Sequence, residues 1–285
     1  MHRLFVDNLT VIDFAFLDPD RGLVGESWIV DVELAGELDH QGMVFDFSLV
    51  KKRIKRLIDE QADHRLLVPQ DFSGLTVQQH NDQGSALTWR TRQGDKIEHR
   101  SPADSVLFTP GSQLDEASLA RQLEQALASV LPANVDAVSL TLRPEVIQGP
   151  WYHYVHGLKK HDGNCQRIAH GHRSRLLIER NGVRADDLEQ QWADRFQDIY
   201  IATREDLLEQ FHEDGCQYHH YGYHSDQGEF ALTIAAHRVH LIDTDSTVEW
   251  IADHLLKQCQ NADPGAQFRV RAFEGVGKGA LADSA

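Results

Sequence analysis

The sequence predicts an α+β protein built from two similar halves. In each half, two strands joined by a turn come first, helices with one apolar face follow, and a strand closes the unit. Strands and helices in runs, with hairpins instead of strict strand–helix alternation, are typical of this class. Similar segments also recur in the same order about half a chain length apart, which indicates an ancient duplication.

Three pairs of segments carry the repeat. LVGESWIVDVELAG (23–36) parallels AHGHRSRLLIERNG (169–182), SLTLRPE (139–145) parallels FRVRAFE (268–274), and HNDQGSALT (80–88) parallels HSDQGEFALT (224–233). We therefore expect two units, residues 1–148 and 149–285, with a boundary near Gln148-Gly149-Pro150. Because no Ser/Gly-rich linker joins them, we expect the units to pack rigidly.

The elements of each half follow from apolar spacing. In DFSLVKKRIKRLIDEQ (46–61), Val50, Ile54, Leu57 and Ile58 form one stripe of a helix, which Asp46 or Ser48 can cap. The other segments expected in the first half are strands at 4–16, 28–34 and 135–144, a hairpin-like stretch around 82–84 and a helix at 115–131. The helices expected in the second half lie at 186–196, 204–212 and 247–259.

Composition and charge narrow the class of protein. The chain has 285 residues, is 41% hydrophobic and contains no apolar run long enough to span a membrane. Its start, MHRLFVDNLTVIDF, lacks a signal-peptide pattern, so we expect a cytoplasmic protein. A net charge of -16 argues against binding to nucleic acid. The three cysteines are odd in number and far apart, which favours free thiols.

A histidine cluster predicts a metal site. His170 and His172 flank Gly171 on a predicted strand, so both side chains project from one face. His156 ends WYHYVH, which is predicted to be the antiparallel neighbour of that strand. Three imidazoles with an open fourth position are typical of catalytic zinc, although the chain has 17 histidines and scattered surface positions are the alternative. Cys165 is either a fourth ligand or a base beside the metal, and spacing alone does not choose.

Taken in order, these pieces resemble the 6-pyruvoyl-tetrahydropterin synthase and 6-carboxytetrahydropterin synthase family, which has the T-fold. The matching pieces are YHYVH, Cys165, HGH at 170–172, GMVFDFSLVKKRIKRLIDEQADHRLL, STVEW and RAFEG. The resemblance implies two tandem T-fold units, each an antiparallel four-stranded sheet with helices on one face. It also implies a zinc ion held by His156, His170 and His172.

The family's pieces are divided between the halves. The first half keeps Asp63-His64 but has Val24-Gly25-Glu26 where the histidine ligands would stand. The second half keeps the histidines and Cys165 but has ATREDLLEQ where Asp-His would stand. We therefore expect one composite site, formed within one chain or between chains. Four residues separate Cys165 from His170 instead of the usual three or five, which leaves the product open.

The resemblance assigns roles around a dihydropterin, typically 7,8-dihydroneopterin triphosphate. Zinc would polarise the side-chain oxygens, while Cys165, Asp63 and His64 would move protons. The product would be a 6-pyruvoyl- or a 6-carboxy-tetrahydropterin, the latter used in deazaguanine (queuosine) biosynthesis. The substrate contacts implied by the resemblance are Glu274 (or its counterpart Glu145), Thr247 and Glu249. Three basic residues near the thiol, either phosphate contacts or a solvated charge run, are Lys159, Lys160 and Arg167.

Two other functions remain open at this point. One is a related T-fold enzyme that cleaves unphosphorylated dihydroneopterin, and the other is a pterin- or purine-binding protein without turnover. An intact thiol together with Asp63-His64 favours an enzyme. Because T-fold units protect their strand edges by pairing into barrels, we also expect a homo-oligomer.

Overall fold

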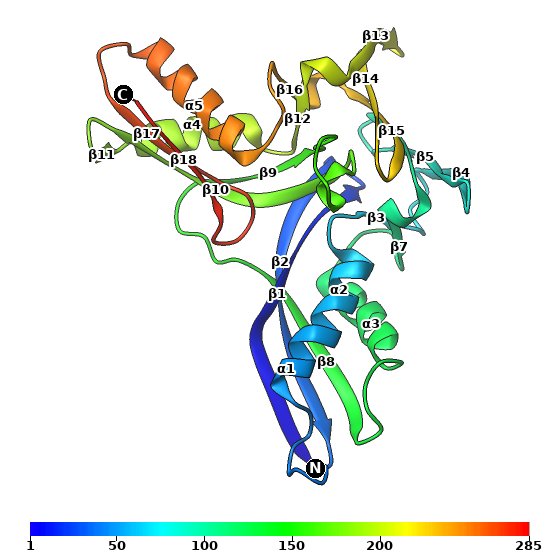
Figure 1. The fold of residues 1–285 in the computed structure, drawn as a ribbon. Coiled ribbons are helices and arrows are strands. Elements are labelled where there is room, and N and C mark those ends of the chain that lie inside the picture. Colours follow the sequence, from blue (N-terminus) through cyan, green and yellow to red (C-terminus); the bar gives the residue numbers. More distant parts are fainter. Residues whose placement is uncertain (285) are drawn as a thin grey trace.

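The computed structural model describes residues 1–284 and contains three sheets (Figure 1). The elements of the first half are β1 (His2–Asp18), β2 (Gly22–Gly36), α1 (Phe47–Leu49), a π-helical turn (Val50–Ile54), α2 (Lys55–Ala62), β3 (Leu66–Pro69), β4 (Leu75–Asn81), β5 (Gly84–Arg90), β6 (Lys96–Ser101), β7 (Val106–Thr109), α3 (Glu116–Leu127) and β8 (Val135–Pro144). Those of the second half are β9 (Trp151–His156), β10 (His170–Arg180), β11 (Val183–Arg184), α4 (Asp186–Phe196), β12 (Ile199–Thr203), β13 (Leu207–Glu213), β14 (Cys216–Ser225), β15 (Gly228–Ala235), β16 (Val239–Ile242), α5 (Val248–Ala262), β17 (Phe268–Phe273) and β18 (Gly279–Asp283).

The two halves repeat one strand order. The first sheet runs β7-β3-β1-β2-β8, and the second runs β16-β12-β9-β10-β17-β18 with β11 beside β10. In each, the long central pair is antiparallel, and the next two strands are added in parallel at one side. The second half therefore corresponds to the first strand for strand, with β11 and β18 as additions.

The third sheet joins the halves. Its order is β13-β14-β15-β6-β5-β4, so each half contributes three consecutive antiparallel strands. The central pairing sets Leu232 of β15 opposite His99 of β6. In Figure 1 this sheet lies to the upper right, with α2 and α3 below it and α4 and α5 to the left. Backbone hydrogen bonding therefore continues across the boundary between the halves.

The expected α+β class is confirmed, but the expected sheets of four antiparallel strands are not what the structure contains. The first two sheets have five and seven strands, and both include parallel pairs. The difference arises between the two helices of each half, where the chain inserts five strands in one excursion. Two of the five extend the half's own sheet, and the other three form its share of the third sheet.

Most predicted elements are confirmed, including the helix at 46–61, which begins where Asp46 Oδ1 accepts from Ser48 N at 2.7 Å. The helix predicted at 204–212 is wrong. Residues Arg204–Asp206 form a single 3₁₀ turn, and Leu207–Glu213 is strand β13. Helix propensity over so short a segment is worth little, and cross-strand pairing with β14 outweighs it.

One of the three repeat pairs also proves not to be structurally equivalent. Asp82-Gln83 turns between β4 and β5, whereas Asp226-Gln227 turns between β14 and β15. By topology, the counterpart of the β14–β15 turn is the β5–β6 turn instead. The shared letters therefore reflect common turn chemistry, in which Gly84 and Gly228 both adopt positive φ (125° and 128°).

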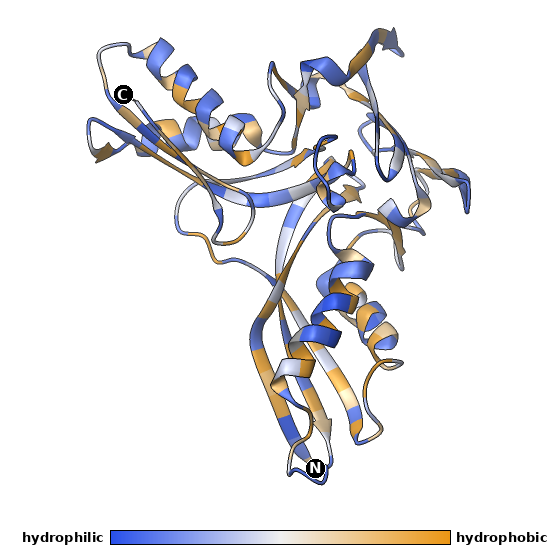
Figure 2. Cartoon of the chain, viewed as in Figure 1, coloured by the Kyte–Doolittle hydropathy of each residue, from blue (hydrophilic) through white to orange (hydrophobic). Residues whose placement is uncertain are grey.

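The core is divided into three parts. One lies between the first sheet and α2 and α3, and a second lies between the second sheet and α4 and α5. Helix α5 is an example of how a helix contributes to such a core. Its buried residues form one stripe toward the second sheet, and its hydrophilic residues lie on the other side of the helix (Figure 2). The third part mixes both halves and includes Trp89 of the first half and Tyr221 of the second. No helix within residues 1–284 combines the length and apolarity that crossing a membrane requires.

The backbones of the two halves lie close together at two glycines. Gly25 of β2 and Gly171 of β10 are the middle residues of the repeat-equivalent triplets at 24–26 and 170–172. A Cβ added to Gly171 would lie 2.6 Å from Gly25 Cα and 2.5 Å from Tyr154 O. A Cβ added to Gly25 would lie only 1.9 Å from the same carbonyl oxygen. Since backbone atoms surround both positions, only glycine fits at this crossing.

We expect Gly171→Ala to lower the free energy of unfolding by about 3 kcal/mol, the upper range for overpacking a rigid site. Gly265→Ala is the matched control, because its new methyl would meet only Asp263 Oδ1, at 3.9 Å. The control should stay within about 0.5 kcal/mol of wild type. Denaturant titration of both variants measures the difference, and equal stabilities would contradict the close crossing.

Candidate active site

Three buried histidines converge where β9 pairs with β10. The register sets His170 directly opposite His156, and His172 follows two residues later on the same face. One ring nitrogen from each of the three lies within 4.8 Å of the others. The closest pair is His156 Nε2 and His172 Nε2, 3.2 Å apart. The strand pairing expected from the sequence therefore brings the three imidazoles together.

The hydrogen bonds of the outer ring nitrogens define which nitrogens face the centre. His156 Nδ1 lies 2.8 Å from Ser246 O, and His170 Nδ1 lies 2.9 Å from Arg167 O. A carbonyl oxygen only accepts, so each Nδ1 carries the proton and each Nε2 presents a lone pair. Burial lowers the pKa of both histidines well below the usual value, which keeps them neutral.

This arrangement suits a divalent metal. The buried Nε2 of His170 has no hydrogen-bond partner. If His172 Nδ1 carries its proton toward Asp13 Oδ1 at 3.2 Å, then His156 Nε2 and His172 Nε2 present two lone pairs 3.2 Å apart, which repel unless a cation lies between them. Donor atoms around a tetrahedral zinc ion lie about 3.5 Å apart, given Zn–N bonds of about 2.1 Å. Backbone carbonyls that fix the outer nitrogens are also the usual support for histidine ligands. The three histidines therefore fit a zinc ion with one open position.

Asp13 of β1 supports the third histidine from the other half. Asp13 Oδ1 lies 3.2 Å from His172 Nδ1 and accepts from Ser27 Oγ at 2.5 Å, while Oδ2 lies 3.1 Å from Lys278 Nζ. Burial alone would raise the pKa of Asp13, but His172, Lys278 and Ser27 together lower it below the usual value. The sequence analysis missed this residue; its only signal was one carboxylate within the apolar run VIDFAF.

A second group of side chains adjoins the histidines. His64, which follows α2, and Cys165, in the turn Asn164–Gln166, place a ring nitrogen and Sγ within 4.8 Å of each other and of a His170 nitrogen. The His64 and His170 ring centroids are 5.1 Å apart. Residues from the two halves thus meet within a single chain, although about 100 positions separate them in the sequence.

The backbone and Asp63 hold His64 in place. Asp63 Oδ2 lies 2.6 Å from His64 Nδ1, and its other oxygen accepts from Asp13 N at 2.8 Å. His64 adopts a left-handed backbone (φ 55°), and its amide donates to Asp13 O at 2.6 Å. Burial lowers the pKa of His64, but Asp63 and Cys165 outweigh this effect and raise it to about 10. Asp63 therefore orients a cationic imidazole beside the thiol.

The expected substrate contacts are placed unevenly. Glu274, at the end of β17, brings Oε1 to 3.8 Å from His172 Nε2. The carboxylate of Glu145 instead lies 3.5 Å from Arg175 Nη2. Thr247 caps α5 by accepting from Trp250 N at 3.4 Å, and Glu249 is exposed in the first turn of that helix. Of the four, Glu274 is the one that the structure brings to the histidine cluster.

Two of the three basic residues near the thiol are paired with carboxylates. Lys159 Nζ lies 2.6 Å from Asp206, and Lys160 Nζ lies 2.9 Å from Asp245. Arg167 is buried and donates to His64 O at 3.3 Å. Burial and neighbouring Arg65 lower the pKa of Arg167 to about 10. Arg167 thus supports the backbone of the composite site.

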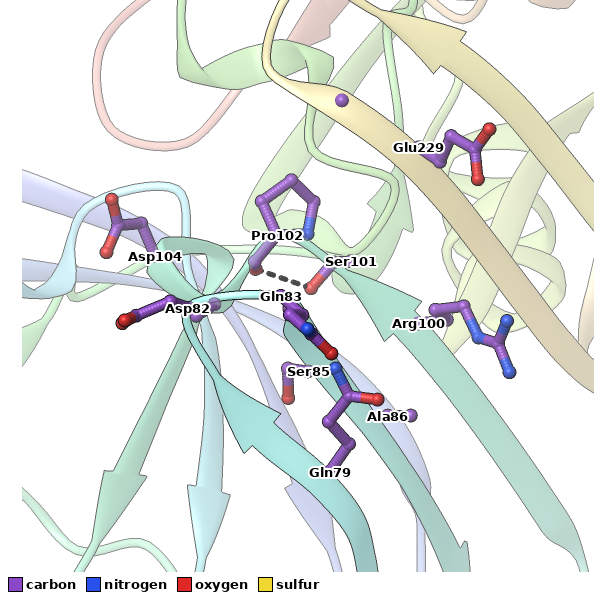
Figure 3. Close-up of a pocket in the computed structure, with 13 residues that line it drawn as sticks. Gln79, Asp82, Gln83, Ser85, Ala86, Arg100, Ser101, Pro102, Asp104 and Glu229 are labelled. Atoms are coloured by element: carbon purple, nitrogen blue, oxygen red, sulfur yellow. Dashed lines mark hydrogen bonds between the residues drawn. The ribbon is translucent and has the colours of Figure 1, made fainter.

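A separate depression lies on the third sheet (Figure 3). It is formed between the β4–β5 turn, with Asp82 and Gln83, and the start of β15, with Glu229. Arg100 and Asp104 line it as well. None of the residues predicted from the sequence to form the site lines this depression.

Fold and geometry together define a protein with a candidate mononuclear metal centre next to a thiol–imidazole pair. Residues 2–140 match the family described as 6-pyruvoyl tetrahydropterin synthase. This match covers just under half of the chain, and the first half is thus similar to the 6-pyruvoyl tetrahydropterin synthase family.

Curated relatives agree with this assignment. The chain is 35% identical over 66 residues to the 6-carboxy-5,6,7,8-tetrahydropterin synthase of Rickettsia conorii, covering 23% of this chain and 48% of that protein. It is 30% identical over 66 residues to the putative 6-carboxy-5,6,7,8-tetrahydropterin synthase of Pyrococcus horikoshii, covering 23% and 39%. The matched segment covers about half of the Rickettsia protein and less than half of the Pyrococcus protein. This chain is about twice as long as the Rickettsia protein.

Solved structures with similarity include two 6-pyruvoyl tetrahydropterin synthases. The protein from Plasmodium vivax is 19% identical with a TM-score of 0.42, covering 52% of this chain and 93% of that chain. The protein from Plasmodium falciparum is 14% identical with a TM-score of 0.40, covering 50% and 90%.

We expect Asp13→Asn to weaken zinc binding at the three histidines by about 10- to 100-fold, because it removes the charge that orients His172. Competition with a chromophoric chelator measures the affinity. Asp31→Asn is the control, since Asp31 pairs with Arg143 Nε at 2.7 Å on the same half. Unchanged affinity in a folded Asp13→Asn protein would contradict a role for Asp13.

Proposed function

We propose that this chain is a zinc-dependent pterin synthase that acts on 7,8-dihydroneopterin triphosphate to form a 6-pyruvoyl- or 6-carboxy-tetrahydropterin. The observation that carries the proposal is the meeting of His64, Cys165 and His170 within 4.8 Å in one chain. The family match of residues 2–140 and the names of the curated relatives point to pterin chemistry. A thiol beside a metal-fitting cluster favours turnover over simple binding.

Each residue of the composite site has a chemical task in this proposal. When bound, zinc would act as a Lewis acid toward side-chain oxygens of the pterin. Cys165 moves a proton at the carbon next to those oxygens. His64 relays that proton, and Asp63, 2.6 Å from His64 Nδ1, fixes the ring orientation. The first half thus supplies the relay, and the second half supplies the thiol and ligands.

Glu274 is the candidate for orienting the pterin. A carboxylate accepts two parallel hydrogen bonds from the guanidine-like edge of a pterin, which gives both affinity and direction. Its position near His172 sets the pterin against the metal-fitting cluster. Glu145 is the weaker candidate because its carboxylate pairs with Arg175 at 3.5 Å, whereas that of Glu274 lies beside His172. We also propose Thr247 and Glu249 as additional contacts with the pterin.

We also propose a homo-oligomer. Within residues 1–284, β8 and β18 each pair with a strand on one side only, so each ends a sheet with unpaired backbone groups. Such edges are commonly protected by pairing with another chain. The mass of the particle in solution, measured by light scattering, tests this proposal.

We expect His170→Ala to abolish tight zinc binding at the three-histidine centre, because two imidazoles remain where three fit the ion. Metal analysis together with chelator competition measures the loss. His2→Ala is the control, since His2 is exposed at the start of β1. Full retention of the tight zinc ion in His170→Ala would contradict the assignment of the ligands.

We expect Cys165→Ala to keep its zinc but to lose turnover by about 100-fold or more, the usual contribution of a general acid or base. His64→Ala should lose a similar factor, since both belong to one relay. The double variant should be little worse than either single variant, because members of one catalytic unit are non-additive. Multiplicative losses, or loss of zinc in Cys165→Ala, would contradict the proposed relay.

Product identification separates the proposal from its alternatives. Wild-type protein is incubated with 7,8-dihydroneopterin triphosphate and, separately, with unphosphorylated dihydroneopterin. Elimination of triphosphate or formation of the carboxy product supports the proposal. Turnover of the unphosphorylated compound alone favours the aldolase-type alternative, and binding without turnover favours the pterin-binding alternative.

A further inference from the structure

A second group of potential metal ligands lies outside the candidate active site, where the two halves meet in the third sheet. It consists of Asp95 in the β5–β6 turn, Cys216 at the start of β14 and His237 in the 3₁₀ turn Ala236–Arg238. One oxygen, the sulfur and one ring nitrogen lie within 4.8 Å of one another. We propose that these three residues form a second zinc site, which ties the halves together.

The donor set suits zinc. Thiolate, imidazole and carboxylate are its three usual protein ligands, and the anionic sulfur and oxygen balance the charge of the dication. A tetrahedral ion requires donor separations of about 3.3–3.8 Å, so a small inward movement of these side chains is enough. His237 Nε2 already lies 3.2 Å from Asp95 Oδ2. Three protein ligands leave the fourth position to water.

The turn that carries Asp95 is held in place before any ion binds. Thr91 N donates to Asp95 O at 2.9 Å, and Asp95 N donates back to Thr91 Oγ1 at 3.0 Å. Gly94 adopts φ 101°, as this tight turn requires. The next residue, Lys96, donates its amide to Tyr218 OH of β14 at 3.2 Å. The β5–β6 turn is thus fixed against the strand that begins with Cys216.

Neighbouring groups leave the ligand atoms available. The sulfur of Cys216 donates weakly to Gln217 O at 3.6 Å and also adjoins the Tyr218 hydroxyl, and a zinc ion can displace both neutral partners. Arg238 Nε is 3.8 Å from Asp95 Oδ2 and makes no hydrogen bond there. Lys96, the other nearby cation, pairs with Glu213 and Glu98 instead. Of the two, Arg238 is thus the cation close to the Asp95 carboxylate, and it approaches without a hydrogen bond that a metal ion would have to break.

The position of the site gives it a structural role. Asp95 belongs to the first half, whereas Cys216 and His237 belong to the second, and β6 and β15 pair beside them. An ion bound to all three would therefore link two segments that are about 120 positions apart in sequence. Such a link stabilises the paired arrangement because the ion binds only when both halves are in register.

Site-resolved alkylation tests the proposal without relying on catalysis. Full-length protein is treated with a haloacetamide, with added zinc or after chelation, and each cysteine peptide is quantified by mass spectrometry. Zinc should slow alkylation of Cys216 at least about tenfold, because a coordinated thiolate is a poorer nucleophile. Cys259 is buried and serves as the internal reference, while Cys165 reports separately on the active-site cluster.

Two ligand variants complete the test. His237→Ala and the conservative Asp95→Asn should each remove the protection of Cys216 and leave the behaviour of Cys165 unchanged. His224 is an exposed histidine on β14 outside the group, so the His224→Ala control should retain the protection of Cys216 by zinc. Circular dichroism confirms that each variant is folded. The proposal is overturned if zinc fails to protect Cys216 in wild type, or if protection persists in both ligand variants.

Discussion

The backbone of β2 crosses that of β10 at Gly25 and Gly171, and the candidate site depends on this contact. Because neither position tolerates a Cβ, the two sheets approach closer there than side chains would allow. Ser27, two residues after Gly25, accepts from Arg173 N at 3.1 Å and donates to Asp13. The crossing therefore brings Asp13 beneath His172, and Asp13 in turn binds the backbone of His64.

At the same crossing, equivalent positions of the two halves hold different side chains. By strand register, Asp13 corresponds to His153, because they pair with the equivalent residues Ser27 and Arg173. Glu26 likewise corresponds to His172. The contact between Asp13 and His172, at 3.2 Å, thus has a counterpart between His153 and Glu26, at 3.8 Å, with acid and base exchanged. Burial raises the pKa of Glu26 to about 7 and lowers that of His153 to about 4, so burial favours the uncharged forms of both side chains over an ion pair.

The elements were largely predictable, because their apolar spacing is a local property. The stripe in α5 and the strand β8 could be located from one sequence. Residues 204–212 could not, since pairing with β14 decides their conformation. The size of the sheets could not be predicted from the sequence either, because the third sheet forms only when β6 and β15, from different halves, share hydrogen bonds.

The sequence by itself determined that three histidines of two paired strands could bind one metal ion. The two-residue period of a strand places His170 and His172 on one face, and antiparallel pairing brings His156 opposite. It also indicated that Asp63-His64 and Cys165 belong to one site. Only the tertiary structure decided that they meet within a single chain, and that Asp13 links Asp63 to His172. The reason is physical: contacts between distant strands are set by how the two sheets cross, and that crossing leaves no periodic pattern in the sequence.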